Sequence, residues 1–147
     1  MNHQPNQSIE ILLVEDNIDD ADLLVDVLQQ EQARAKVQVI EDGEAALAYL
    51  RRDEPYLNAV RPHLILLDLN LPRKSGHELL AEIKTDPELK RIPVIILTTS
   101  TSDLDVKTSY ALGANSFVTK PVDLDHLYAI VGAINNFWLR TATLSPR

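Results

Sequence analysis

The 147-residue chain has no cysteine and only four glycines. Without cysteine it can form no disulfide, no thiolate nucleophile and no zinc–thiolate site, and this composition fits a reducing compartment. The glycines are too few and too widely spaced for a P-loop or a dinucleotide-binding fingerprint. The nucleophile elbow of serine hydrolases is also missing. These absences exclude several common kinds of enzyme site.

Basic residues and long apolar runs are scarce as well. The chain has 14 Lys and Arg against 22 Asp and Glu, a formal net charge of -8, and no basic stripe. Nucleic-acid binding needs clustered Lys and Arg, so we expect no nucleic-acid partner. No stretch approaches the length of a membrane helix, and Met1 to Gln7 is polar rather than an apolar signal segment. We therefore expect a cytoplasmic protein with no membrane partner.

Strand-like and helix-like segments alternate five times along the chain. Short apolar runs rich in branched residues predict strands near Ile9 to Val14, Val37 to Ile40, Leu64 to Leu67, Val94 to Leu97 and Ser116 to Val118. Amphipathic patterns predict helices near Asp20 to Gln30, Glu44 to Arg52, Gly76 to Lys84, Leu104 to Leu112 and Leu124 to Trp138. This alternation predicts an α/β fold, a doubly wound parallel sheet with helices on both faces.

The length of the chain suits one domain. We expect a disordered N-terminal extension over residues 1–8, a domain over residues 9–138 and a C-terminal tail over residues 139–147.

Polar residues follow four of the predicted strands. They are Glu15 with Asp16, Asp68, Thr98, and Lys120 before a proline. Polar side chains just past the carboxyl ends of parallel strands converge in one crevice. Three carboxylates, a hydroxyl and an ammonium suit a divalent cation and a phosphoryl group far better than they suit a core. The pattern therefore predicts a phosphoryl-transfer site.

The segments around these residues resemble the receiver domain of two-component response regulators. The matching segments are Leu12 to Asn17, Glu41 to Gly43, Leu66 to Pro72 with Ser75 and Gly76, Pro93 to Thr98, and Gly113 with Ala114 and Phe117 to Pro121. The resemblance covers roughly Ile9 to Asn136, nearly the whole chain. It implies a flavodoxin-like fold with five helices and five parallel strands in the order 2-1-3-4-5.

The resemblance implies a role for each polar residue. Asp68 is expected to accept a phosphoryl group from a sensor histidine kinase, with Lys120 pairing first with Asp68 and then with the phosphoryl group. Thr98 is expected to donate its hydroxyl to that group, and Phe117 to turn inward when Thr98 moves. The alternatives are an Asp68 that caps a turn, a Thr98 that initiates a helix and a Phe117 that is a plain core aromatic. The resemblance also implies a cis peptide bond between Lys120 and Pro121.

The same resemblance implies a Mg²⁺ site, at which Mn²⁺ or Ca²⁺ could substitute. Asp16 is expected to bind the ion directly and Glu15 mostly through water, with Asp68 and the backbone carbonyl of Asn70 completing the protein ligands. Glu15 departs from the family, in which Asp is commoner at this position. A longer arm should shift the water shell without abolishing the site.

Three further acids lie close to these ligands in the sequence, Asp19, Asp20 and Asp22. We interpret them as a helix cap and first-turn acids that the helix dipole favours.

Two features separate this chain from other receivers. The segment from Arg51 to Pro62 is longer than usual, and is either a partner-contacting loop or a tolerated surface insertion. We expect no output domain, so signalling is expected to pass through contacts with a downstream protein that the sequence does not identify. Together with the Phe137-Trp138-Leu139 tail, these features resemble the stand-alone response regulators of bacterial phytochrome histidine kinases.

The last predicted helix has more apolar surface than one sheet face needs. Its second apolar stripe, with Ile130, Ala133 and Phe137, lacks an obvious internal partner. We expect a homodimer through this helix and its neighbours, with Phe137 as an anchor and Trp138 nearer the core or the seam. The alternative is that the tail from Leu139 to Pro146 folds back over this stripe.

Two other functions remain open at this stage. A haloacid-dehalogenase-like phosphatase also uses a strand-end Asp with Mg²⁺, but Asn70 stands where such enzymes have a second Asp. A degenerate receiver that never takes phosphate is disfavoured, because no acceptor, metal or switch position is missing. We expect a signalling protein rather than an enzyme, with at most slow self-dephosphorylation.

Overall fold

The computed structural model describes residues 7–146 and contains one five-stranded parallel sheet. Its strands are β1 (Ile9–Val14), β2 (Ala35–Ile40), β3 (Leu64–Leu67), β4 (Val94–Thr98) and β5 (Ser116–Thr119). The spatial order is β2-β1-β3-β4-β5, which confirms the predicted order and fold class. Six of the eight residues in the predicted disordered extension lie outside the described residues.

Five helices and one terminal π-helix connect or follow these strands. They are α1 (Ile18–Glu31), α2 (Gly43–Arg51), α3 (Gly76–Thr85), α4 (Asp103–Ala111), α5 (Leu124–Ile134) and η1 (Asn135–Thr141). All five predicted helices are present. Their predicted ends differ from the observed ones by at most two residues, except at the end of the last helix.

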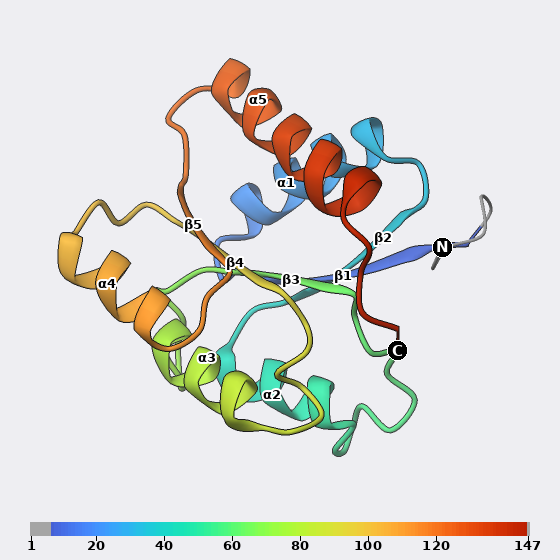
Figure 1. The fold of residues 1–147 in the computed structure, drawn as a ribbon, viewed down its shortest axis with the longest axis vertical. Helices are drawn as coiled ribbons and strands as arrows, with labels where there is room; N and C mark the ends of the chain where they lie inside the picture. The colour runs from blue at the N-terminus through green and yellow to red at the C-terminus, as the bar shows by residue number, and fades with distance from the viewer. Residues whose placement is uncertain (1–6, 147) are drawn as a thin grey trace.

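The sheet separates two apolar cores. In Figure 1, α1 and α5 cover one face of the sheet, and α2 and α3 cover the other. Side chains of β1 alternate between the cores, because successive residues of a strand point to opposite faces: Ile11 and Leu13 pack beneath α1 and α5, whereas Leu12 and Val14 pack beneath α2 and α3. Strand β3 is buried throughout, as a central parallel strand must be.

Side-chain caps begin the five α-helices shortly after the strands end. Each cap accepts a hydrogen bond from a backbone N–H of the first turn, and the caps are Asn17, Asp42, Ser75, Ser102 and Asp123. The cap of α1 is therefore Asn17, and the prediction that one of Asp19, Asp20 and Asp22 caps this helix is wrong. Asp19 and Asp20 do lie in its first turn. Because the caps fix where the helices begin, the helix starts lie close to the carboxyl edge of the sheet.

The end of α5 differs from the sequence prediction. After Ile134 the chain continues as the π-helix η1, whose turns are wider than α-helical turns. Leu139, which lies beyond the predicted end of this helix at Trp138 and outside the predicted apolar stripe, is buried. Leu144 is also buried in the core beneath α1 and α5, so the predicted tail contributes to that core. The tail leaves Phe137 54% exposed.

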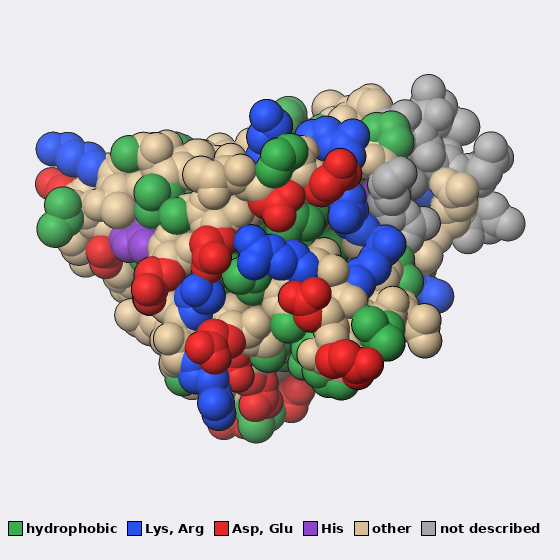
Figure 2. Space-filling model, turned by 90° about the horizontal axis from the view of Figure 1, so that it is seen from below, with side chains coloured by type: hydrophobic (Ala, Val, Ile, Leu, Met, Phe, Trp, Pro, Cys, Tyr) green, Lys and Arg blue, Asp and Glu red, His purple; other side chains and the backbone are tan. Residues whose placement is uncertain are grey.

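The long segment before β3 lies on the side of the sheet that α2 and α3 cover. Ion pairs join its two ends to the α3–β4 connection, Arg51 to Asp86 at 3.7 Å and Arg61 to Glu88 at 3.5 Å. Figure 2, seen from below Figure 1, shows acidic and basic side chains interspersed over this face. Within residues 7–146, no helix combines the length and apolarity needed to cross a bilayer.

Candidate functional site

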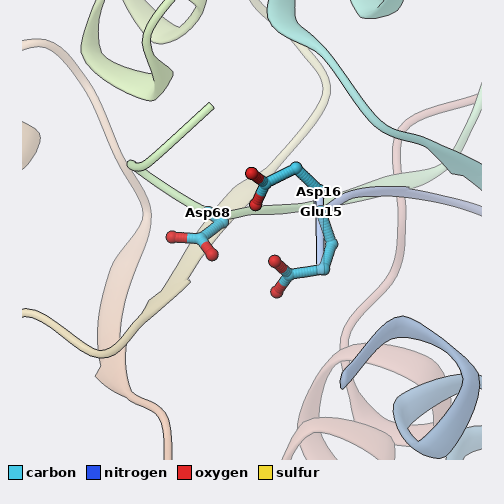
Figure 3. A group of neighbouring side chains, drawn as sticks. All are labelled: Glu15, Asp16 and Asp68. Atoms are coloured by element: carbon cyan, nitrogen blue, oxygen red, sulfur yellow. The ribbon is translucent and has the colours of Figure 1, made fainter. Parts of the chain in front are cut away.

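Three carboxylates meet where β1 and β3 end. Glu15 and Asp16 directly follow β1, and Asp68 directly follows β3, its neighbour in the sheet. One carboxylate oxygen from each lies within 4.8 Å of the others, and Figure 3 shows the three side chains gathered at this edge. Glu15 and Asp68 are buried, whereas Asp16 is exposed. The topology therefore brings the predicted acidic residues together across 53 residues of sequence.

Lys120 places its ammonium among these carboxylates. Its backbone N–H donates to the Thr98 carbonyl at 2.7 Å, which holds the end of β5 beside the end of β4. Its Nζ donates to Asp68 Oδ2 at 3.0 Å and forms a close ion pair with Glu15 Oε1. The predicted cis bond before Pro121 is wrong, because the one cis peptide bond among the described residues lies elsewhere, at Glu54–Pro55. Lys120 reaches the site with a trans bond to Pro121, and its backbone is held by the hydrogen bond to Thr98.

Burial and pairing set the charges in this cluster. Burial raises the pKa of Glu15 to about 7; the hydrogen bond from Lys120 opposes this, and the nearby charge of Asp68 adds to it. Burial would also raise the pKa of Asp68, but the hydrogen bonds from Lys120 and the Asn70 amide outweigh it and hold that pKa below its ordinary value. Burial would lower the pKa of Lys120, yet its hydrogen bonds to Glu15 and Asp68 prevail and raise it. Asp68 is thus kept as an anion beside a permanent cation.

The loop after β3 holds Asp68 in place. The backbone N–H of Asn70 donates to Asp68 Oδ1 at 3.2 Å, and the N–H of Gly76 donates to the Leu69 carbonyl at 2.9 Å. Ser75 and Glu78 form a capping box that fixes the start of α3 directly behind this loop. The predicted role of the Asn70 carbonyl as a metal ligand stays a prediction.

Thr98 lies at the end of β4 and is completely buried. Its hydroxyl oxygen has no hydrogen-bond partner among residues 7–146. A buried hydroxyl without a partner costs free energy, so such a group calls for an explanation. Phe117, on the neighbouring strand, is half-buried and packs against the core beneath α2 and α3, while its N–H donates to the Tyr110 hydroxyl at 3.1 Å.

Asp20 contacts Lys120, which the sequence did not indicate. Its Oδ2 lies 3.3 Å from Lys120 Nζ, across 100 residues of sequence. A first-turn acid is common on any helix, so nothing in the local sequence distinguishes Asp20 from Asp19. Only the packing of α1 beside the end of β5 brings it to Lys120.

The donor set fits a hard divalent cation. Carboxylate oxygens are the ligands that Mg²⁺, Mn²⁺ and Ca²⁺ prefer, and Mg²⁺ needs few protein contacts because it keeps several waters. The exposed carboxylate of Asp16 leaves such an ion open to solvent on one side. Asp16, Glu15 and Asp68 could therefore hold the ion.

Comparisons with known proteins agree with this geometry. The profile of the family described as response regulator receiver domain matches residues 11–132. Response regulator Rcp1 of Synechocystis sp. is 47% identical over 144 residues, covering 98% of this chain and 98% of that protein.

Two solved structures are similarly close. The Mn(2+)-bound form of response regulator Rcp1 superposes with a TM-score of 0.88 at 48% identity, covering 93% of this chain and 99% of that one. The phosphorylated cyanobacterial phytochrome response regulator RcpA superposes with a TM-score of 0.89 at 50% identity, covering 93% and 98%.

Proposed function

Because the chain belongs to the response regulator receiver family, we propose that Asp68 accepts a phosphoryl group from the phosphohistidine of a sensor histidine kinase. One observation carries this proposal. The buried carboxylate of Asp68 lies 3.0 Å from the ammonium of Lys120 and beside the acidic pair of Glu15 and Asp16. A structural Asp that only capped a turn would need neither neighbour.

The proposed transfer joins an Asp68 carboxylate oxygen to phosphorus. The O–P bond forms as the P–N bond to the donor imidazole breaks, and the leaving nitrogen keeps the electron pair and takes up a proton. The low pKa of Asp68 keeps the attacking carboxylate deprotonated, and the Asn70 amide orients its other oxygen. Lys120, already on Oδ2, can pass to a phosphoryl oxygen without leaving the site.

Mg²⁺ is the proposed resident ion, held by Asp16, Glu15 and Asp68 and by the Asn70 backbone carbonyl. When bound, it would neutralise the charge on the transferring phosphoryl oxygens. The all-oxygen donor set supports this assignment, as does the Mn(2+)-bound structure of the relative Rcp1.

Thr98 and Phe117 are the proposed switch. The Thr98 hydroxyl is buried without a partner, so a phosphoryl oxygen on Asp68 would give it an acceptor and draw it toward the site. Phe117, half-buried on β5 opposite Ile96 of the same strand β4, would turn into the space that Thr98 leaves. The change is a population shift between two states of the surface formed by α4, β5 and α5.

The proposed kinase partner is linked to a phytochrome, because the similar protein RcpA is a phytochrome response regulator. A second proposed partner is another copy of this chain, which pairs through Ile130, Ala133, Phe137 and Trp138. Exposure of Ala133 and Phe137 supports this interface, whereas Ile130 and Trp138 also pack against the core and contribute less free surface. Trp138 lies edge-on to Phe137, with ring centroids 5.2 Å apart. The downstream protein is not identified.

The comparisons give no support to the phosphatase alternative, since the family profile and the relatives are response regulators. Asn70, two residues after Asp68, also cannot serve as the acid–base residue of such an enzyme, because its side-chain amide does not ionise.

The test is phosphorylation of the intact chain. Incubation with acetyl phosphate and Mg²⁺ should add one phosphoryl group, measured by intact mass, and Asp68→Asn should abolish the adduct. Asp42→Asn is a matched control, because Asp42 caps α2 outside the site. The absence of any adduct on the wild type, or an equal adduct on Asp68→Asn, contradicts the proposal.

A further inference from the structure

The ammonium of Lys120 is shared by three carboxylates, and only two of them belong to the proposed phosphoacceptor site. Glu15 forms the closest pair, Asp68 Oδ2 lies at 3.0 Å and Asp20 Oδ2 at 3.3 Å. The Lys120 side chain is only 13% exposed, whereas that of Asp20 is 48% exposed. Asp20 therefore approaches the ammonium from the solvent side, while the other two acids lie beneath it.

Asp20 differs from the other two partners in its relation to the metal. Glu15 and Asp68 both belong to the group of three carboxylates that can hold a divalent ion, and Asp20 does not. A divalent ion on Glu15 and Asp68 draws electron density from the oxygens that Lys120 contacts and repels the ammonium itself. Asp20 is then the one carboxylate partner of Lys120, among the described residues, that the ion leaves unshared.

The position of Asp20 is fixed by the loop that carries the metal ligands. The backbone N–H of Asp20 donates to the Asn17 side chain at 3.1 Å, and the N–H of Asn17 donates to Glu15 Oε2 at 3.2 Å. The chain from Glu15 to the first turn of α1 is thus one hydrogen-bonded unit. The bond from Asp20 to the Asn17 cap does not involve the side chains of Glu15 and Asp68, so the backbone of Asp20 keeps its place in the first turn of α1 when those side chains are redirected toward an ion.

We propose that Asp20 is a positioning residue that retains the Lys120 ammonium at the site when a divalent ion occupies Glu15 and Asp68, ready for the incoming phosphoryl group. This inference rests on the proposed function, because it assumes that the acidic group binds a metal. In the metal-free protein Asp20 is the most distant of three partners and adds little. In the metal-bound protein it is the principal partner, so the Asp20–Lys120 pair favours metal binding.

The experiment measures Mg²⁺ affinity by titration calorimetry at about 0.15 M salt, where charges more than about 8 Å apart are largely screened. Asp20→Asn should weaken Mg²⁺ binding by about threefold, the size expected for a partly exposed ion pair. Asp19→Asn is the matched control: Asp19 lies in the same first turn and carries the same charge, and its carboxylate has no partner among residues 7–146. It should leave the affinity within about 1.5-fold of wild type. Asp20→Glu, which restores the charge, should recover most of the loss.

A double-mutant cycle separates positioning from a general charge effect. In a Lys120→Ala background, Asp20→Asn and Asp19→Asn should have the same small effect on Mg²⁺ affinity, because the ammonium that Asp20 holds is gone. If Asp20→Asn and Asp19→Asn change Mg²⁺ affinity equally in the protein that retains Lys120, the inference is overturned. It is also overturned if Asp20→Asn still weakens Mg²⁺ binding threefold in the Lys120→Ala background. Neither result bears on whether Asp68 is phosphorylated, which the acetyl phosphate experiment measures separately. A wild type that binds no divalent ion overturns both the inference and the metal assignment.

Discussion

Gly76 lies so close to the backbone of Asp68 that a Cβ on Gly76 would sit 2.4 Å from the Asp68 carbonyl oxygen. The first residue of α3 therefore packs directly against the proposed phosphoacceptor, and any side chain there must displace the loop. Gly43 is similarly confined, with a Cβ position 2.0 Å from the Lys74 carbonyl oxygen. Two helix starts are thus pressed onto the loop that leaves β3, which makes the position of Asp68 sensitive to small changes in backbone packing.

Gly76→Ala should lower both stability and phosphorylation. Forcing a methyl group into this contact should cost about 1–3 kcal/mol of unfolding free energy and move Asp68 relative to Lys120. Urea unfolding and the rate of adduct formation with acetyl phosphate measure the two effects. Gly132→Ala is the control: a Cβ there meets nothing within 4 Å, so it should stabilise helix α5 by about 0.5–1 kcal/mol. Equal stabilities of the two variants would contradict the packing argument.

Thr98→Val should stabilise the unphosphorylated protein. Valine has nearly the same shape and removes a buried hydroxyl without a partner, which should raise the unfolding free energy by about 1 kcal/mol. Ser109→Ala should do the opposite by a similar amount, since the buried Ser109 hydroxyl donates to the Asp105 carbonyl at 2.7 Å and lies 3.0 Å from His77 Nε2. Phosphorylation of the wild type should change the NMR signals of Phe117, and phosphorylated Thr98→Val should lack that change. A Thr98→Val protein that is less stable than wild type would show that its hydroxyl is satisfied.

Mg²⁺ should stabilise the folded protein by mass action, because the unfolded chain lacks the assembled site. Addition of millimolar Mg²⁺ should raise the melting temperature of the wild type, and Asp16→Asn should remove most of that rise. Asp22→Asn serves as the control, since it removes the same charge from α1 without touching the three-carboxylate group. Equal rises in the Asp16→Asn and Asp22→Asn proteins would place the bound ion elsewhere.

The stability of the metal-free protein should depend on the ionisation of Glu15. Its pKa is raised from 4.5 to about 7 in the folded state. At a pH between these two values, the folded chain therefore keeps a proton that the unfolded chain has lost. The free energy of unfolding should therefore fall as pH rises through this range. The low pKa of Asp68 acts in the opposite direction and only at more acidic pH, where that carboxylate gains a proton.

Urea midpoints in excess chelator at about pH 5 and about pH 8 test this linkage. Glu15→Gln cannot ionise, so its midpoint should change much less than that of the wild type over the same interval. An equal fall in both proteins would assign the pH dependence to another group.

Sedimentation tests the proposed homodimer. Phe137→Glu puts a charge into the proposed interface. The variant should be a monomer at tens of micromolar protein, where the wild type should be dimeric. Leu104→Glu is the matched control, because Leu104 is 72% exposed on α4 and lies outside the proposed interface. A monomeric wild type, or a Phe137→Glu protein that remains dimeric, rules this interface out.

The sequence by itself determined the fold class and the residues that gather at the site. Apolar runs such as Leu64 to Leu67 identified buried parallel strands, and the polar residues that follow them, Asp68 and Lys120 among them, could be assigned to one edge because the carboxyl ends of parallel strands converge. Both signals are local in the chain, so they can be read without knowing how the helices pack.

Only the tertiary structure decided which partners these residues meet. The contact between Asp20 and Lys120 spans 100 residues and depends on how α1 lies beside β5. The burial of the Thr98 hydroxyl without a partner likewise depends on the surrounding side chains. The widened turns of η1 turned Leu139 into the core, because a change from α-helical to π-helical hydrogen bonding alters which face each later residue occupies. Long-range packing and small changes in helix geometry leave no local pattern, and so the sequence alone could not predict them.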